Sequence, residues 1–241
     1  MIKHIKNVDV NYIEYGEGEK TIVLLHGWGQ NIEMMRPVGD RLTGNRIVIV
    51  DLPGYGQSSE PDYVWSVYDY VECIKELLDS LKIDKPILIG HSFGGKISLV
   101  YASMYDVEKL ILFGSPFKKG IEKLSFKTKM LKKAKKIPIL NKFEGFAKKH
   151  IGSTDYKNAS DMMRKILVGT VNLNITEDVK KIKCPTLIIW GTQDEAVPVE
   201  DAYELEELIP DAGTVIYEGC THYAYLERLT QVVNVIKVFI K

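Results

Sequence analysis

The sequence predicts an α/β fold, in which a mostly parallel sheet is covered by helices on both faces. Short apolar runs of the length of buried strands alternate along the chain with segments whose apolar residues recur at helical spacing. The runs are almost continuously aliphatic, as is typical of parallel strands buried on both sides. The alternation stops at Phe117 and resumes after Asp178, which predicts a helical insertion within one α/β unit.

The individual elements follow from these patterns and from the residues that end them. Residues 2–15 alternate weakly and break at Asn7-Val8-Asp9, which predicts a hairpin closed by Gly16-Glu17-Gly18. Strands are predicted over residues 21–25, 46–50, 86–90, 107–113, 186–190 and 214–217. Helices are predicted over residues 33–42, 66–81, 94–104, 199–209 and 225–240. The core is then expected to comprise residues 1–116 and 179–241, with residues 117–178 as a helical lid.

Composition limits the classes of protein to which the chain can belong. Its 241 residues suffice for one full core, and 32 basic residues balance 32 acidic ones, so the overall charge does not indicate a nucleic-acid partner. The three cysteines, Cys73, Cys184 and Cys220, lack metal-like spacing and suit a reducing compartment better than a disulfide framework. Since no apolar run is long enough for a signal peptide or a transmembrane helix, a cytoplasmic location is expected.

A candidate nucleophile lies where a predicted strand turns into a predicted helix. The stretch Gly90-His91-Ser92-Phe93-Gly94 has the pattern Gly-x-Ser-x-Gly. A sharp strand-to-helix turn forces its middle residue into a strained backbone conformation and leaves that side chain exposed at the edge of the sheet. Glycines two residues before and after are needed because side chains there would collide. We therefore predict that Ser92 is a nucleophile.

A serine hydroxyl needs a base to take its proton, and one of five histidines is suitably placed. Functional groups of open parallel sheets gather at the carboxyl ends of the strands. His222 follows the last predicted strand, so it is the predicted base. The others lie in the first strand, before the serine, in the turn itself and in the lid: His4, His26, His91 and His150.

The base in turn needs an acid that orients it, and this acid is expected after a strand that follows Ser92. The strand ending near Phe113 is followed by no carboxylate, whereas the strand ending at Trp190 leads into Gly191-Thr192-Gln193-Asp194. Asp194 is the predicted acid, and its neighbour Glu195 is the reserve candidate.

Acyl transfer also needs hydrogen-bond donors for the developing oxyanion, each worth roughly 3–4 kcal/mol. The predicted donors are the backbone N–H groups of Phe93, at the positive end of a helix, and of Trp28, in the glycine-rich loop after residue 25. The substrate pocket is predicted to include His26, Gly27, Trp28, Phe143 and Phe146, with His26 orienting the loop. The sequence contains no nucleotide-binding or metal-binding motif, so no cofactor and no metal are expected.

Five motifs occur in an order that resembles the α/β-hydrolase superfamily, over all of the chain except the lid. They are His26-Gly27-Trp28-Gly29, Asp51 to Ser58 (DLPGYGQS), Gly90 to Gly95 (GHSFGG), Gly191-x-x-Asp194-x-x-Val197-Pro198 and His222-x4-Glu227. The resemblance implies an eight-stranded sheet with a helical cap, and it implies the same roles for Ser92, Asp194 and His222. The first two motifs are similar to those of carboxylesterases that act on the pimeloyl-carrier methyl ester. Leu229, where proline is common, and Cys220-Thr221, where glycine is common, depart from the pattern.

The predicted lid is strongly basic. Between Lys118 and Lys149, twelve lysines stand against two glutamates, which gives +10 in a chain of zero formal net charge. Such a field could attract an acidic acyl carrier or a coenzyme A-linked acyl group, although a solvated amphipathic face is the favoured interpretation.

The chain is therefore predicted to be a serine hydrolase of a carboxylic ester, or of a thioester. A carbon–carbon bond hydrolase or lyase with the same triad and a non-catalytic ligand-binding protein are the alternatives.

Overall fold

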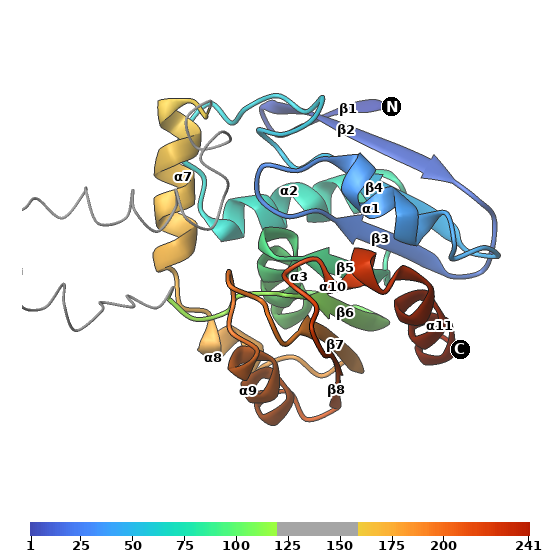
Figure 1. Cartoon of the computed structure of the whole chain (residues 1–241). Coiled ribbons are helices and arrows are strands. Elements are labelled where there is room, and N and C mark those ends of the chain that lie inside the picture. The colour runs from blue at the N-terminus through green and yellow to red at the C-terminus, as the bar shows by residue number, and fades with distance from the viewer. Residues whose placement is uncertain (120–158) are drawn as a thin grey trace, which may run out of the picture.

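An eight-stranded sheet runs through the protein in the order β1-β2-β4-β3-β5-β6-β7-β8 (Figure 1). The computed structural model describes residues 1–119 and 159–241. The strands are β1 (Ile2–Ile5), β2 (Val8–Tyr15), β3 (Thr21–Leu25), β4 (Arg46–Val50), β5 (Ile87–His91), β6 (Lys109–Phe113), β7 (Thr186–Gly191) and β8 (Ala212–Tyr217). β1 and β2 are antiparallel to their neighbours, and the other pairs are parallel. The prediction of a mostly parallel, eight-stranded sheet is confirmed.

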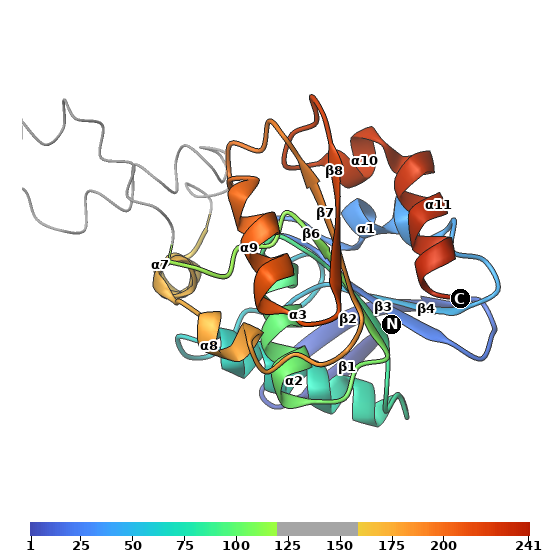
Figure 2. The same cartoon turned by 90° about the horizontal axis from the view of Figure 1, so that it is seen from below.

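Helices cover both faces of this sheet (Figure 2). One face carries α1 (Ile32–Gly39), α10 (Ala224–Glu227) and α11 (Leu229–Phe239), and the other carries α2 (Val67–Ser80), α3 (Phe93–Met104), α8 (Thr176–Val179) and α9 (Glu200–Leu208). Each face has its own cluster of buried apolar side chains. The central strands are buried on both sides, which explains their continuous aliphatic runs.

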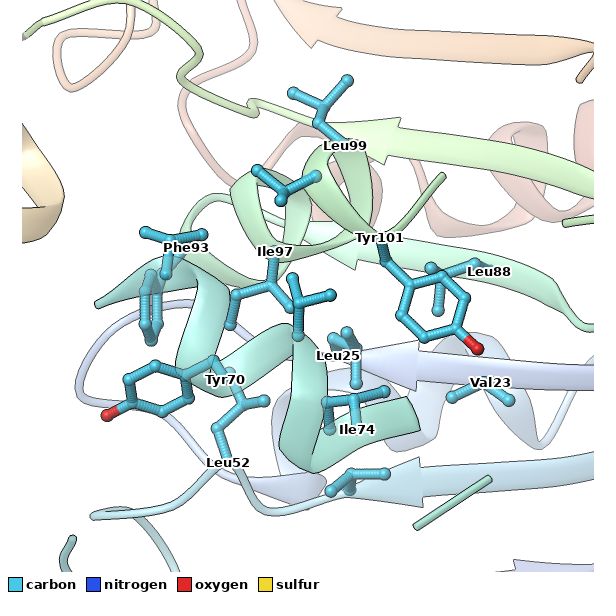
Figure 3. Packing of buried hydrophobic residues seen from close by; sticks show 14 of the residues in the cluster. Val23, Leu25, Leu52, Tyr70, Ile74, Leu88, Phe93, Ile97, Leu99 and Tyr101 are labelled. Carbon is cyan, nitrogen blue, oxygen red and sulfur yellow. The ribbon is translucent and has the colours of Figure 1, made fainter. Parts of the chain in front are cut away.

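Helix α2 illustrates how the local sequence determines an element. Ser66 caps its first turn, and its hydroxyl and the carboxylate of Asp69 form a reciprocal capping box. Val71, Ile74 and Leu77 recur at helical spacing and are fully buried in the apolar cluster that α2 shares with the sheet and α3. Figure 3 shows Ile74 within this cluster. Burial of each such side chain contributes roughly 1.5–3 kcal/mol. The helix therefore fixes the position of α3, which begins directly after Ser92.

Two features of the backbone differ from the prediction. The first hairpin turns at Lys6 and Asn7, because Ile5 pairs with Val8 and Lys6 takes a left-handed conformation with φ of 52°. Gly16-Glu17-Gly18 instead leads the chain onward to β3. The predicted helix over 225–240 is two helices, since the backbone of Arg228 (φ −118°, ψ 35°) leaves the helical region between α10 and α11.

The part of the predicted lid that the structure describes contains α8 and a further helix, α7 (Asp161–Asn172). Ser160 caps α7 by accepting the backbone N–H of Met163. Helix α7 stands beside α2, α3 and α8 in both views (Figures 1 and 2), and the side chain of Met163 packs on Gly54 in the loop after β4. Phe143 and Phe146 lie outside the described residues.

Within residues 1–119 and 159–241, no helix is both long and apolar enough to cross a membrane.

Candidate active site

Ser92 stands at the turn between β5 and α3 with a strained backbone. Its φ of 50° and ψ of −110° lie in a region that residues with side chains rarely adopt. The turn is tight, because a Cβ atom on Gly90 would lie 2.6 Å from the carbonyl oxygen of Gly94. The backbone N–H of Ser92 donates to the carbonyl of Phe113 (2.9 Å), which ties the turn to the end of β6. This geometry is that of a nucleophile elbow.

The predicted base and acid are directly hydrogen-bonded. Nδ1 of His222, in the loop after β8, lies 2.7 Å from Oδ2 of Asp194, in the loop after β7. The other carboxylate oxygen of Asp194 accepts the backbone N–H groups of Ala196 and Val197, each at 2.8 Å. Because a carboxylate accepts hydrogen bonds, Nδ1 of His222 is the donor of this bond, and in a neutral ring Nε2 then carries no proton. Glu195, the reserve candidate, is exposed and makes no such contact.

The end of β6 brings this pair to the elbow. Gly114 follows Phe113, whose carbonyl accepts the N–H of Ser92. A Cβ atom on Gly114 would lie 2.9 Å from Nδ1 of His222 and 3.2 Å from Oδ2 of Asp194. The ring of His91, the residue before the serine, lies 4.7 Å from the ring of His222 between centroids. Three loops that are distant in sequence therefore meet around Ser92.

Two backbone N–H groups near Ser92 have no acceptor within residues 1–119 and 159–241. The first is that of Phe93, which opens α3 and so has no partner inside the helix. The second is that of Trp28, in the loop after β3. This loop is attached to the elbow because the N–H of Gly94 donates to the carbonyl of His26 (3.0 Å). Free donors in this position can stabilise a developing oxyanion.

His26 supports the loop after β3 from beneath. Its ring is fully buried, Nδ1 donates to the carbonyl of Gly27 (2.7 Å), and Nε2 accepts the N–H of Leu52 (3.0 Å). Burial lowers the pKa of His26 to about 4, so the ring is neutral at neutral pH. Both nitrogens are occupied, which leaves no polar atom of this side chain for a substrate.

Aromatic side chains pack around the two free N–H groups. The rings of Trp28 and Phe93 are 5.3 Å apart, and Tyr55 lies 5.2 Å from Trp28 and 6.5 Å from Phe93 between centroids. Phe93 also packs on Tyr70 of α2 (Figure 3). The predicted pocket residue Trp28 therefore belongs to a cluster of aromatic rings that also includes Tyr55.

Sequence reasoning missed two residues of this region, Gln30 and His91. Gln30 accepts the backbone N–H of Gly27 through Oε1 (2.9 Å), and the same oxygen lies 3.2 Å from Nδ1 of His91. The other ring nitrogen of His91 lies 3.2 Å from the carbonyl oxygen of His222. Because His91 lies 61 residues from Gln30 and 131 from His222 in sequence, no local pattern could have indicated its contacts.

Among the residues that the structure describes, no group of three or more His, Cys, Asp and Glu side chains is arranged to hold a metal ion.

Comparison with known proteins agrees with this fold. The sequence model of the family described as alpha/beta hydrolase fold matches residues 20–126 and 128–229. The chain is 30% identical to AB hydrolase superfamily protein YisY of Bacillus subtilis, over 99% of this chain and 97% of that protein. It is 28% identical to a 2-hydroxy-6-oxononadienedioate/2-hydroxy-6-oxononatrienedioate hydrolase of Paraburkholderia phymatum, over 91% of this chain and 86% of that protein. It is 26% identical to a pimeloyl-[acyl-carrier protein] methyl ester esterase of Aliivibrio fischeri, over 93% of this chain and 95% of that protein.

Proposed function

This chain belongs to the alpha/beta hydrolase fold family, and on that premise we propose that it hydrolyses carboxylic esters through an acyl-enzyme on Ser92. The observation that carries the proposal is the pair of His222 and Asp194, bonded at 2.7 Å beside a serine with φ of 50°. The side chains of Asp194 and His222 are 1% and 13% exposed, so water competes little for their hydrogen bond.

In the first half of the reaction, Oγ of Ser92 attacks the ester carbonyl while Nε2 of His222 takes its proton. Asp194 stabilises the imidazolium through the proton on Nδ1. The N–H groups of Trp28 and Phe93 bind the oxyanion of the tetrahedral intermediate. His222 then gives the proton to the leaving alcohol, and the acyl group stays on Ser92.

In the second half, His222 removes a proton from a water molecule, which attacks the acyl-enzyme. The same two N–H groups bind the second oxyanion, and the proton returns to Oγ of Ser92 as the carboxylic acid leaves. A thioester would follow the same path with a thiol as the leaving group.

A chain-length series of p-nitrophenyl esters tests this function. Ser92→Ala should lower kcat on the order of 10⁴-fold or more, since the nucleophile is removed. Ser103→Ala is the matched control, because the Ser103 hydroxyl only donates to the carbonyl of Val100 within α3. This variant should keep the wild-type rate. Equal turnover by the wild type and Ser92→Ala would refute the proposal.

The alternative is hydrolysis of a carbon–carbon bond with the same residues, and the similarity to the Paraburkholderia phymatum hydrolase favours it. A vinylogous 1,5-diketone assayed beside the esters separates the two reactions. A kcat/KM for the diketone that exceeds those for all esters would select the alternative. Labelling of Ser92 by a fluorophosphonate would count against a purely ligand-binding role.

The basic segment from Lys118 to Lys149 supports a further part of the proposal, the docking of an acidic carrier or a coenzyme A-linked acyl group. Lys118 itself is paired with Asp201 and Glu204 of α9, so it would not take part. If the segment attracts a carrier, added salt should slow hydrolysis of a carrier-linked ester and leave a neutral ester unaffected. Equal salt responses would exclude docking.

A further inference from the structure

We propose that Gln30 is a positioning residue that, together with His91, fixes the loop carrying the oxyanion donor Trp28 relative to the base His222. The inference rests on the proposed function and adds to it a residue that lies outside the recognised motifs. Its basis is a network of hydrogen bonds and close contacts that joins the loop after β3, the elbow and the loop after β8.

Gln30 contacts all three of these segments. Its Oε1 accepts the N–H of Gly27 at 2.9 Å and lies 3.2 Å from Nδ1 of His91. Its Nε2 donates to the hydroxyl of Tyr223 at 3.4 Å. Tyr223 directly follows the base, so this one side chain spans from the oxyanion loop to the base loop.

His91 continues the network to the backbone of the base. Nε2 of His91 lies 3.2 Å from the carbonyl oxygen of His222. The buried ring also packs against those of His222 and Tyr225, with centroids 4.7 and 4.8 Å away. Any displacement of His91 would therefore move the peptide that carries the base.

The fit around Gly27 shows how closely the network controls the oxyanion loop. A Cβ atom at position 27 would lie 2.9 Å from Nδ1 of His91 and 3.1 Å from Oε1 of Gln30. The backbone at Gly27 thus lies directly against both side chains. The next residue is Trp28, and a shift of about 1 Å in a catalytic group can cost about 10² in rate.

The single N–H of a neutral His91 limits which side chains can replace Gln30. A neutral imidazole has one N–H, so His91 donates either to Oε1 of Gln30 or to the carbonyl of His222, and its other 3.2 Å contact is packing without a hydrogen bond. Burial, reinforced by the neighbouring His222, holds the pKa of His91 well below its usual range. Rotating the amide of Gln30 would offer a donor to His91 but would leave the N–H of Gly27 without its acceptor. Only a side chain with a hydrogen-bond acceptor at position 30 can therefore satisfy the backbone N–H of Gly27.

Three substitutions of Gln30 test the proposal in the full-length protein. Gln30→Leu preserves the bulk but removes every polar atom, so kcat for a p-nitrophenyl ester should fall about 10²-fold with little change in KM. Gln30→Asn is one methylene too short to reach all its partners and should lose a similar factor. Gln30→Glu keeps the acceptor for Gly27 and should stay within about tenfold of the wild type.

The readouts separate positioning from a general loss of structure. Gln231→Leu, at an exposed glutamine of α11, is the matched control and should keep the wild-type kcat. The rate of phosphonylation of Ser92 by a fluorophosphonate should fall with kcat in Gln30→Leu, because the tetrahedral adduct also needs the oxyanion donors. If Gln30→Leu does not fold, Gln30→Asn decides the question.

The proposal is overturned if folded Gln30→Leu or Gln30→Asn keeps the wild-type kcat, or if Gln30→Glu falls as far as Gln30→Leu. If Ser92→Ala abolishes turnover in the same assay, such a result removes the role of Gln30 alone. If Ser92→Ala remains active, the proposed function itself fails.

Discussion

Gly114 leaves just enough room for the imidazole of His222. A methyl group on Gly114 would lie 2.9 Å from Nδ1 and 3.0 Å from Cε1 of that ring. Both distances are shorter than a normal contact between non-bonded atoms, so a side chain at this position would push the ring away from the elbow.

Gly114→Ala should therefore lower kcat about 10²-fold, because the base is displaced from Ser92. The substitution should also cost about 1–2 kcal/mol of stability, since Gly114 has a φ of 51° that a side chain disfavours. Steady-state kinetics and denaturant unfolding measure the two effects. Gly169→Ala, in an exposed turn of α7 with open space around it, should instead raise the free energy of unfolding by about 0.5–1 kcal/mol and leave kcat unchanged.

Asp194→Asn should lower kcat about 10⁴-fold with the fold intact. The N–H groups of Ala196 and Val197 require the oxygen of the new amide, so its NH2 group must face Nδ1 of His222. His222 would then carry its proton on Nε2 and could not accept one from Ser92. Glu195→Gln changes the neighbouring exposed carboxylate and should leave kcat unchanged. A larger loss of kcat in Glu195→Gln than in Asp194→Asn would mean that Glu195, not Asp194, is the acid.

Lys96 of α3 attaches α7 to the core. It is 1% exposed, and its Nζ donates to the carbonyls of Thr170 (2.8 Å) and Leu173 (2.5 Å) at the carboxyl end of α7. Burial lowers the pKa of this amine to about 7. The folded protein thus binds fewer protons than the unfolded chain between about pH 7 and the ordinary pKa of lysine.

The free energy of unfolding of the wild type should consequently rise with pH in this window, relative to that of Lys96→Met. Urea unfolding at pH 6, 8 and 10 measures the difference between the two proteins. Lys75→Met, at a lysine of α2 paired with Asp79, controls for loss of a surface charge. A difference that is the same at all three pH values would mean that the buried amine does not titrate in this range.

His26 should make the protein sensitive to acid. Its pKa of about 4 in the folded state lies below the ordinary value of 6.5, so the unfolded chain binds more protons between these two values. Stability from this group is complete above pH 6.5 and is lost as the pH falls towards 4.

His26→Leu leaves the N–H of Leu52 without its acceptor and should be about 1–3 kcal/mol less stable than the wild type at pH 8. The difference in the free energy of unfolding between the two proteins should decrease as the pH falls from 6.5 to 4, because only the wild type loses the contribution of the neutral ring. Parallel stability curves for the two proteins would contradict this account.

The sequence was sufficient to predict the sheet and the pairing of Asp194 with His222 beyond its strands. Ser92, Asp194 and His222 each follow a strand, and parallel strands bring their carboxyl ends to one edge, so strand order alone predicts proximity. The strands themselves were predictable because burial on both faces demands continuous aliphatic runs.

The remaining features depend on contacts between segments that no local pattern records. His91 lies 61 residues from Gln30 and 131 from His222, so their network appears only when the loops are assembled. Lys96 occupies an ordinary helical position, and its role emerges from the end of α7 that covers it. Local helix propensity also did not predict the break at Arg228, where the backbone leaves the helical conformation between α10 and α11.

The role of Ser92 as nucleophile is best tested by the mass of the intact protein after reaction with a fluorophosphonate. We expect one adduct per chain, located on Ser92 by peptide mapping, no adduct in Ser92→Ala, and slow labelling of Asp194→Asn. Labelling of another residue, or an unlabelled Ser92 in a protein that still hydrolyses esters, would contradict this role.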